Sequence, residues 1–236
     1  MPERPGGQIN KRPLHFIWIC DCSGSMTGKK INELNRAIPD GLDAMRDEAK
    51  GQPHAEVKVR VLKFDTNVEW EIETATPIDQ VQWRDLSASG LTNMGEALST
   101  IAEQMKMPPM EKRALPPVLG LVSDGAPTDN FDAGLQDLLS KPWGQKAFRF
   151  AIFLGSGGKD EREVLERFID NPEVPPLFAD NPEKLTQYVR WASTEVIRSA
   201  SSPPSVSSND ENVSSGNVRV TVPDDSDSGN SSKSVW

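Results

Sequence analysis

The stretch "LHFIWICDCSGSMTGKK", residues 14–30, changes character at Asp21. The residues before this aspartate are apolar except for one histidine, whereas two serines with a glycine between them come shortly after it. A continuous apolar run is typical of a strand buried on both faces, and its end at a polar stretch predicts a loop. Apolar residues at helical spacing follow at 31–45. The stretch therefore predicts a buried strand, a loop and a helix in succession.

Two further apolar runs repeat this order of strand and helix along the chain. They span 116–125 and 148–157, and a short strand in "PPLFAD" then precedes a last helix that begins at Asn181 and Pro182. Fully apolar strands that alternate with helices predict a doubly wound α/β fold, in which a mostly parallel sheet carries helices on both faces. Two alternating runs around "DTN", residues 65–67, predict a hairpin and hence one antiparallel strand at the edge of the sheet.

The composition divides the chain into one folded domain and two flexible ends. Its 236 residues suffice for a single large core, which we place at residues 12–198. Residues 1–11 are predicted to be a flexible N-terminus. Residues 199–236 are rich in serine and have little to bury, which predicts a disordered tail. Within this tail, the alternating stretch "NVRVTVPDD", residues 217–225, is a candidate short interaction motif that could add a strand to a partner's sheet.

The charge and hydropathy of the chain exclude several classes of partner. A formal net charge of −9 provides no basic surface for the phosphates of a nucleic acid or for an anionic membrane. No apolar run reaches the roughly 20 residues that a membrane-spanning helix needs, and the first residues lack the apolar segment of a secretory signal. We therefore expect a cytoplasmic protein whose partners are proteins.

The two cysteines of the chain, Cys20 and Cys22, are too close in sequence for an easy disulfide. No second cysteine pair is present to complete a zinc site. We interpret Cys20 as a core residue at the strand end and Cys22 as a loop thiol. A redox or metal role for the pair is the alternative.

Oxygen-bearing side chains gather where the apolar strands end. Asp21, Ser23 and Ser25 occupy alternate positions, so an extended backbone places them on one side. Asp124 ends the second apolar run, and Thr92 lies in the loop before another predicted helix. Ligands of doubly wound sheets bind at the carboxyl ends of the strands, where these side chains are expected to meet. Hard oxygen donors favour Mg²⁺, with Mn²⁺ as the alternative, whereas zinc prefers His and Cys ligands.

Three segments resemble motifs of the von Willebrand factor A domain family. "DCSGS" resembles its Asp-x-Ser-x-Ser motif, "GLTNMGEAL" its threonine loop and "LVSDGAPTD" its aspartate loop. The resemblance implies a doubly wound domain with a metal ion-dependent adhesion site, in which Ser23, Ser25 and Thr92 contact Mg²⁺ directly. Asp21 and Asp124 would bind the ion directly or through water. A Glu or Asp side chain of a partner protein would complete the coordination.

The wording "SDGAPTD" and the absence of a secretory signal resemble the bacterial intracellular TerY-like branch of this family, which is associated with tellurite resistance. This resemblance implies an adaptor in a stress-response or phage-defence system. Such systems also contain a Ser/Thr kinase and a metal-dependent Ser/Thr phosphatase, which are candidate partners. The predicted function is therefore protein binding, and the protein is not expected to be an enzyme.

A small magnesium-dependent phosphoryl-transfer or hydrolytic enzyme is the alternative function. Phosphatases of the haloacid dehalogenase type form an aspartyl-phosphate and carry a second aspartate two residues after the first, where this chain has Ser23. A serine hydrolase needs a base, and the sequence places neither His15 nor His54 near the serines. Binding is therefore the preferred hypothesis.

One residue of the tail is a candidate phosphorylation site. Thr221 is followed three residues later by an aspartate, a spacing that resembles the preference of phosphothreonine-reading forkhead-associated domains. Phosphorylation would add about −1.5 to −2 charges at this position. An inert linker is the alternative.

Local signals around the other loops predict helix caps. Asn93 and Glu96 have the spacing of a capping box at the start of a helix. Asp129 is interpreted as a helix cap and Thr128 as loop packing.

Overall fold

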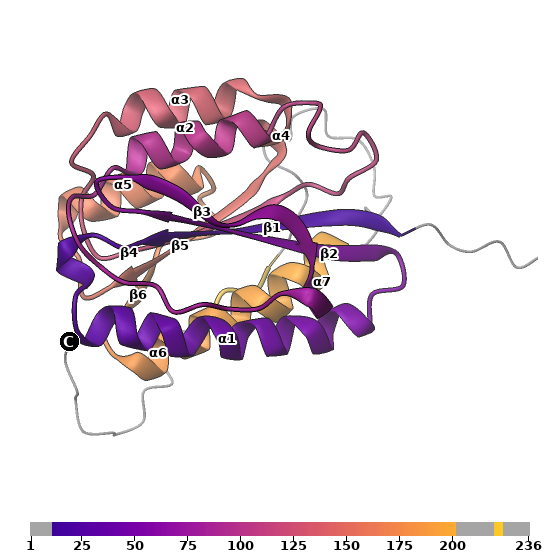
Figure 1. Ribbon diagram of the computed structural model, residues 1–236, viewed down its shortest axis with the longest axis horizontal. Coiled ribbons are helices and arrows are strands. Elements are labelled where there is room, and N and C mark those ends of the chain that lie inside the picture. Colours follow the sequence, from indigo (N-terminus) through magenta and orange to yellow (C-terminus); the bar gives the residue numbers. More distant parts are fainter. Residues whose placement is uncertain (1–10, 202–219, 224–236) are drawn as a thin grey trace, which may run out of the picture.

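The computed structural model describes residues 11–201 and 220–223, and its centre is a six-stranded sheet (Figure 1). The strands are β1 (Arg12–Asp21), β2 (Ala55–Phe64), β3 (Val68–Pro77), β4 (Val118–Ser123), β5 (Phe148–Leu154) and β6 (Leu177–Ala179). The α-helices are α1 (Lys29–Lys50), α2 (Met94–Gln104), α3 (Phe131–Ser140), α4 (Pro142–Lys146), α5 (Lys159–Ile169), α6 (Pro182–Trp191) and α7 (Ile197–Ser201). Short 3₁₀ helices η1 (Gly24–Met26) and η2 (Ile78–Gln80) and a π-helical turn η3 (Ala192–Val196) complete the elements of these residues.

The strand order is β3-β2-β1-β4-β5-β6. Only β3, at one edge, runs antiparallel to its neighbour, and the other strands pair in parallel. Figure 1 shows α1, α6 and α7 on one face of the sheet and α2 and α3 on the other. The predicted doubly wound sheet with an antiparallel edge strand is thereby confirmed. The winding reverses between β1 and β4, and in such sheets the carboxyl ends at this reversal form the ligand site.

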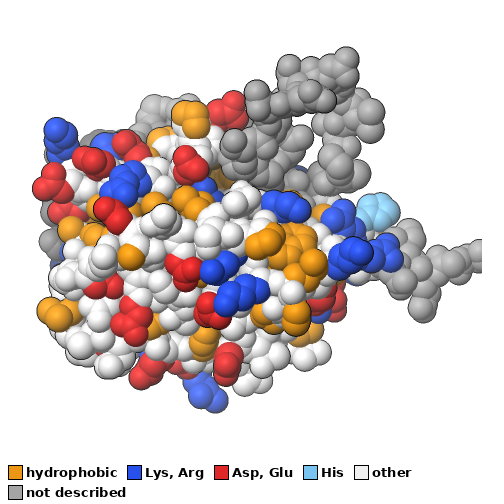
Figure 2. All heavy atoms as spheres, turned by 90° about the horizontal axis from the view of Figure 1, so that it is seen from above, with side chains coloured by type: hydrophobic (Ala, Val, Ile, Leu, Met, Phe, Trp, Pro, Cys, Tyr) orange, Lys and Arg blue, Asp and Glu red, His pale blue; other side chains and the backbone are white. Residues whose placement is uncertain are grey.

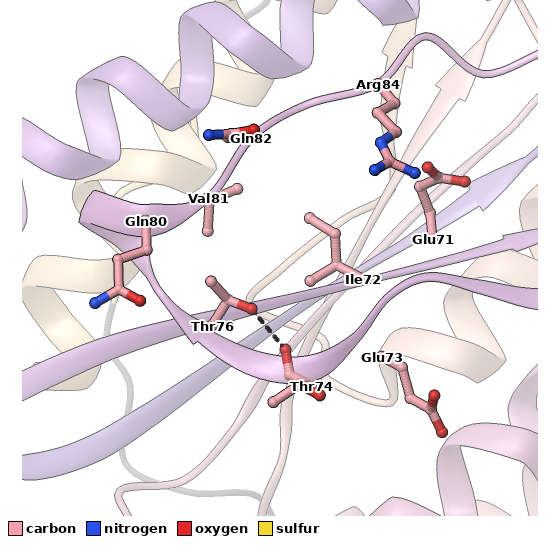
Figure 3. A pocket seen from close by; sticks show the side chains of 9 residues that line it. All are labelled: Glu71, Ile72, Glu73, Thr74, Thr76, Gln80, Val81, Gln82 and Arg84. Atoms are coloured by element: carbon pink, nitrogen blue, oxygen red, sulfur yellow. Dashed lines mark hydrogen bonds between the residues drawn. The ribbon is translucent and has the colours of Figure 1, made fainter.

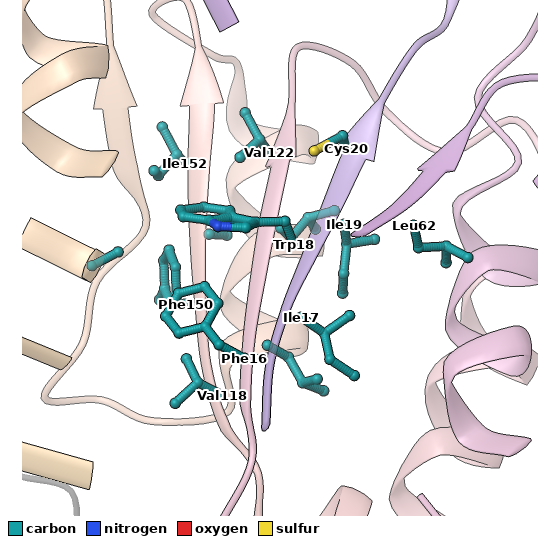
Figure 4. Close-up of a cluster of buried hydrophobic side chains, with 14 of the residues drawn as sticks. Phe16, Ile17, Trp18, Ile19, Cys20, Leu62, Val118, Val122, Phe150 and Ile152 are labelled. Carbon is teal, nitrogen blue, oxygen red and sulfur yellow. The ribbon is translucent and has the colours of Figure 1, made fainter. Parts of the chain in front are cut away.

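The rings of Trp18 and Phe150 meet across the sheet because a glycine lies between them. Trp18 in β1 pairs with Gly120 in β4, which in turn pairs with Phe150 in β5. The two ring centroids are 5.8 Å apart in an edge-to-face arrangement, and Trp191 of α6 contacts Phe150 in the same manner. Figure 4 shows the two rings beside Phe16. This packing fixes the register of β1 and β4, so that their last residues lie side by side.

Candidate metal centre

Asp21 is the last residue of β1 and is completely buried. Its Oδ1 accepts a 2.8 Å hydrogen bond from the backbone N–H of Ser23, and its Oδ2 accepts a 2.6 Å hydrogen bond from Ser123 Oγ at the end of β4. Burial raises the pKa of Asp21, the hydrogen bonds from Ser123 and Ser23 lower it, and the nearby charge of Asp124 raises it further. Asp21 is thus a fixed carboxylate at the carboxyl end of the central strands.

A series of hydrogen bonds joins the first serine loop to the aspartate of the neighbouring strand. Ser23 Oγ and Ser25 Oγ are 3.1 Å apart, and Ser25 Oγ donates to Asp124 Oδ1 at 2.6 Å. The turn η1 places the two hydroxyls, because Met26 is buried beneath it and Gly24 N–H donates to the backbone oxygen of Gly90. The structure therefore brings together three of the predicted donors from segments about 100 residues apart.

Thr92 faces the same space as Ser25. A Cβ placed on Gly125 would lie 3.9 Å from Ser25 Oγ and 4.0 Å from Thr92 Oγ1, so the absence of a side chain at Gly125 leaves room between the hydroxyls. The backbone N–H of Thr92 donates to Thr128 Oγ1 at 3.0 Å, and the N–H of Thr128 donates to the carbonyl of Thr92 at 2.9 Å. Thr128 therefore holds the backbone of Thr92, which is more than the loop packing expected of it.

The start of α2 is capped from outside its own segment. Asp129 accepts hydrogen bonds from the backbone N–H groups of Gly95 and Glu96 at 2.9 and 2.8 Å. The predicted capping box is wrong, because the side chain of Asn93 makes no capping bond and instead donates to the carbonyl of Thr66 at 2.8 Å. Asp129 is thus a cap, as predicted, and it couples the loop before α3 to the loop that carries the threonine.

Cys22 lies in the loop after β1, as predicted, but its side chain is buried. Its backbone N–H donates to the carbonyl of Phe64, and its carbonyl accepts from the N–H of Ser89. Burial raises the pKa of Cys22 to about 12. The segment folds inward because the end of β2 and the loop before α2 enclose it on both sides.

The chemistry of the donor set fits a hard divalent cation. Asp21 and Asp124 contribute carboxylates, and the other three donors are hydroxyls, which suit Mg²⁺ or Mn²⁺ better than Zn²⁺. Within residues 11–201 and 220–223, no group of three or more His, Cys, Asp and Glu side chains is placed to hold a metal. The side chains of Asp21 and Asp124 are both buried, and the charge of Asp124 acts on Asp21, so a cation between them would stabilise both carboxylates.

Lys30 is a member of this cluster that the sequence did not indicate. Its Nζ donates to Asp124 Oδ2 at 2.6 Å, so that Asp124 accepts from Ser25 on one oxygen and from Lys30 on the other. The side chain of Asp124 is 0% exposed and that of Lys30 24%. The pairing of Lys30 with Asp124 joins residues 94 positions apart, so only the tertiary structure reveals it.

The predicted phosphorylation site lies in the short described part of the tail. Thr221 is exposed, and its carbonyl accepts a 2.7 Å hydrogen bond from Trp191 Nε1, while Val220 and Val222 pack against the core. Residues 220–223 form no strand. The rest of the predicted interaction motif lies outside the described residues, and phosphorylation of Thr221 stays a prediction.

A polar pocket of about 360 Å³ lies between β3 and the segment after it, away from these donors (Figure 3). Glu71, Glu73 and Arg84 are its charged lining residues, and Figure 3 shows the guanidinium of Arg84 near the carboxylate of Glu71. None of the predicted metal donors lines it. On the face seen in Figure 2, acidic and basic side chains are interspersed.

Comparison with known proteins identifies the fold. The sequence model of the von Willebrand factor type A domain matches residues 17–190. No curated protein sequence matches the chain significantly. No helix in the part of the chain that the structure describes is long and apolar enough to cross a membrane.

Solved structures of proteins from several organisms have the same fold. A von Willebrand factor type A protein from Catenulispora acidiphila has a TM-score of 0.58 at 16% identity over 78% of this chain and 42% of its own. The ArnB paralog VWA2 from Sulfolobus acidocaldarius has a TM-score of 0.56 at 19% identity, covering 76% and 44%. Proximal thread matrix protein 1 from the mussel byssus has a TM-score of 0.56 at 14% identity, covering 76% and 47%. This chain spans less than half the length of each.

Proposed function

Because this chain belongs to the von Willebrand factor type A domain family, we propose that it is a metal-dependent protein-binding module. Its cation site is formed by the five oxygen-bearing side chains at the ends of β1 and β4 and in the loop before α2, namely Asp21, Ser23, Ser25, Thr92 and Asp124. The observation that carries the proposal is the hydrogen-bonded series from Ser23 through Ser25 to Asp124, next to the buried carboxylate of Asp21. Mg²⁺ is the preferred ion, and Mn²⁺ is the alternative.

The bound ion would supply a positive centre for a carboxylate of a partner protein. An ion held by few protein carboxylates keeps part of its coordination for outside ligands. In this chain Asp21 is held by Ser123 and by the backbone of Ser23, so the site is organised before a partner arrives. Ser25 is exposed, which leaves the serine loop accessible to another protein.

The rim of the site adds an apolar contact. Leu91, next to Thr92, is 55% exposed, which is unusual for a large apolar side chain in this structure. A single exposed apolar side chain is ordinary on a protein surface, but its position beside the metal donors makes Leu91 available to a protein that binds there. A partner that places its carboxylate at the metal would cover Leu91 at the same time.

The proposed setting is that of the TerY-like branch, with this chain as a cytoplasmic adaptor beside a Ser/Thr kinase and a metal-dependent Ser/Thr phosphatase. What supports this setting is the resemblance of "SDGAPTD" to that branch. Phosphorylation of Thr221 by such a kinase would be compatible with its exposure.

Calorimetry with metal ions tests the site directly. Wild-type protein should bind one Mn²⁺ or Mg²⁺, and Asp124→Asn should abolish this binding because it removes one of the two carboxylates. Asp132→Asn, an exposed aspartate in the first turn of α3, is the matched control and should bind like wild type. Absence of heat with wild-type protein at millimolar metal would overturn the proposal.

A pull-down from native lysate tests the binding function. Wild-type protein in Mg²⁺ should retain partners that are lost in EDTA and with Asp124→Asn. Partners retained equally under all conditions would place the binding surface away from the metal donors.

Fewer observations support the alternative function, that of a magnesium-dependent phosphoryl-transfer or hydrolytic enzyme. His15 lies six residues before Asp21 on β1, which is about 20 Å along an extended strand. The carbonyl of His54 accepts a hydrogen bond from the backbone N–H of Arg12, at the same amino end of the sheet. Neither is placed to act as a base for the serines. Turnover of p-nitrophenyl phosphate that depends on Mg²⁺ and is lost in Asp21→Asn would favour the enzyme.

A further inference from the structure

The first turn of α1 carries charges that oppose the helix dipole. The helix begins with Lys29 and Lys30, and no acidic residue lies in its first turn. Each of α2, α3, α5 and α6 has at least one acidic residue in its first turn. Cations near the positive end of a helix are unfavourable, so a lysine that breaks this rule and is partly buried indicates a role outside helix stability.

The partner of Lys30 explains its position. Its ammonium donates to Asp124 Oδ2 at 2.6 Å, and the carboxylate it contacts is 0% exposed. Asp124 already accepts from Ser25 Oγ, a neutral donor, on its other oxygen. Lys29, by contrast, is exposed. Of the two lysines, only Lys30 is therefore part of the cluster.

The balance of charge in the cluster then depends on Lys30. Asp21 and Asp124 together carry two negative charges, which one divalent cation neutralises. With Lys30 included, the cluster with its cation has a net charge of one positive unit, and a carboxylate ligand would make it neutral. Without Lys30, the same carboxylate would leave a net negative charge in a partly buried site, which is unfavourable.

We propose that Lys30 is a specificity-determining residue that makes the metal centre select an anionic ligand. This inference rests on the proposed metal-binding function. It also predicts an opposite effect of Lys30 on the affinity for the metal ion. Because Lys30 and a metal ion share Asp124, removing the ammonium relieves the repulsion between the two cations. Loss of Lys30 therefore strengthens metal binding while it weakens carboxylate binding.

The test uses Mn²⁺ and acetate with the full-length protein. Mn²⁺ affinity is measured by calorimetry, and acetate affinity is measured on the Mn²⁺-loaded protein from the loss of water-proton relaxation as acetate displaces bound water. Acetamide serves as the neutral isostere. Lys30→Met removes the charge and keeps an apolar stem, Lys30→Arg keeps the charge, and Lys29→Met is the control for a lost charge on the same helix turn.

Lys30→Met is expected to bind Mn²⁺ at least as tightly as wild type and acetate about two- to five-fold more weakly. Lys30→Arg should retain most of the acetate binding, and Lys29→Met should behave like wild type. Acetamide binding should not differ among the variants. Unchanged acetate affinity in Lys30→Met, or Mn²⁺-loaded wild type that does not prefer acetate over acetamide, would overturn the inference. Failure of wild type to bind Mn²⁺ would instead overturn the proposed function.

Discussion

Ser123 Oγ donates a 2.6 Å hydrogen bond to Asp21 Oδ2, although the two residues are 102 positions apart in sequence. The bond crosses from β4 to β1 at their carboxyl ends, where the chain reverses its winding. The backbone N–H of Ser23 donates to the other carboxylate oxygen, Oδ1. Together the two hydrogen bonds fix the orientation of the Asp21 side chain. Ser123 is thus a residue that positions a proposed metal donor.

Removing this hydroxyl should weaken metal binding. In Ser123→Ala the Oδ2 atom of Asp21 loses the hydroxyl that donates to it, so the carboxylate is held less firmly. Loss of a partner that orients a metal ligand typically costs about 10-fold or more in affinity, which calorimetry with Mn²⁺ would measure. Ser140→Ala, an exposed serine at the end of α3, is the control. Equal Mn²⁺ affinity in Ser123→Ala and wild type would show that Asp21 needs no such support.

Gly120 should not tolerate a side chain. A Cβ at this position would lie 2.4 Å from Phe150 Cζ, between rings that are packed edge to face. Overpacking of this kind costs about 1–3 kcal/mol of the free energy of unfolding, measurable by urea denaturation of Gly120→Ala.

Gly51 provides the matched control, because a Cβ there would be 3.4 Å from the nearest atom, Glu48 O, and φ is −78°. Gly51→Ala should leave the free energy of unfolding unchanged or raise it by about 0.4–1 kcal/mol. If the two variants were equally stable, the packing over Gly120 would be looser than the structure indicates.

Asp129 should stabilise the domain through α2. In Asp129→Ala the N–H groups of Gly95 and Glu96 lose their acceptor, which should lower the free energy of unfolding by about 1 kcal/mol. Asp132→Ala removes a nearby exposed aspartate of α3 and should have a smaller effect. Similar denaturation midpoints for the two variants would mean that water replaces Asp129 at the start of α2.

His15 should make the stability of the domain depend on pH. Burial lowers the pKa of His15 from 6.5, although its 2.6 Å hydrogen bond to Glu111 opposes this shift. The unfolded chain therefore takes up a proton at a higher pH than the folded chain. The contribution of His15 to the free energy of unfolding should be fully present above pH 6.5. It should be lost as the pH drops below this value and through the pKa of the folded state.

His15→Gln keeps a side chain that can donate to Glu111 but does not titrate. It should show a weaker loss of stability between about pH 7 and pH 5 in urea denaturation. His54→Gln, which removes an exposed histidine, should retain the wild-type dependence. An unaltered pH dependence in His15→Gln would assign the effect to other groups.

The sequence alone determined the fold class and the candidate donors, because both depend on local patterns. Continuous apolar runs identify strands buried on both faces, and the residues at the end of each run lie at the carboxyl edge of a parallel sheet. Asp21 and Asp124 could therefore be selected without coordinates. The role of Gly120 is not visible in the sequence, because it depends on two rings from non-neighbouring strands that meet over this glycine.

Only the tertiary structure decided which side chains support those donors. The hydrogen bonds of Ser123 to Asp21, of Lys30 to Asp124 and of Thr128 to Thr92 join segments that are 102, 94 and 36 residues apart. Local propensity does not encode them, since they depend on strand order and on the direction of each side chain. The failure of the predicted capping box has the same cause. In the folded chain the side chain of Asn93 donates to the carbonyl of Thr66, and Asp129 caps the helix instead.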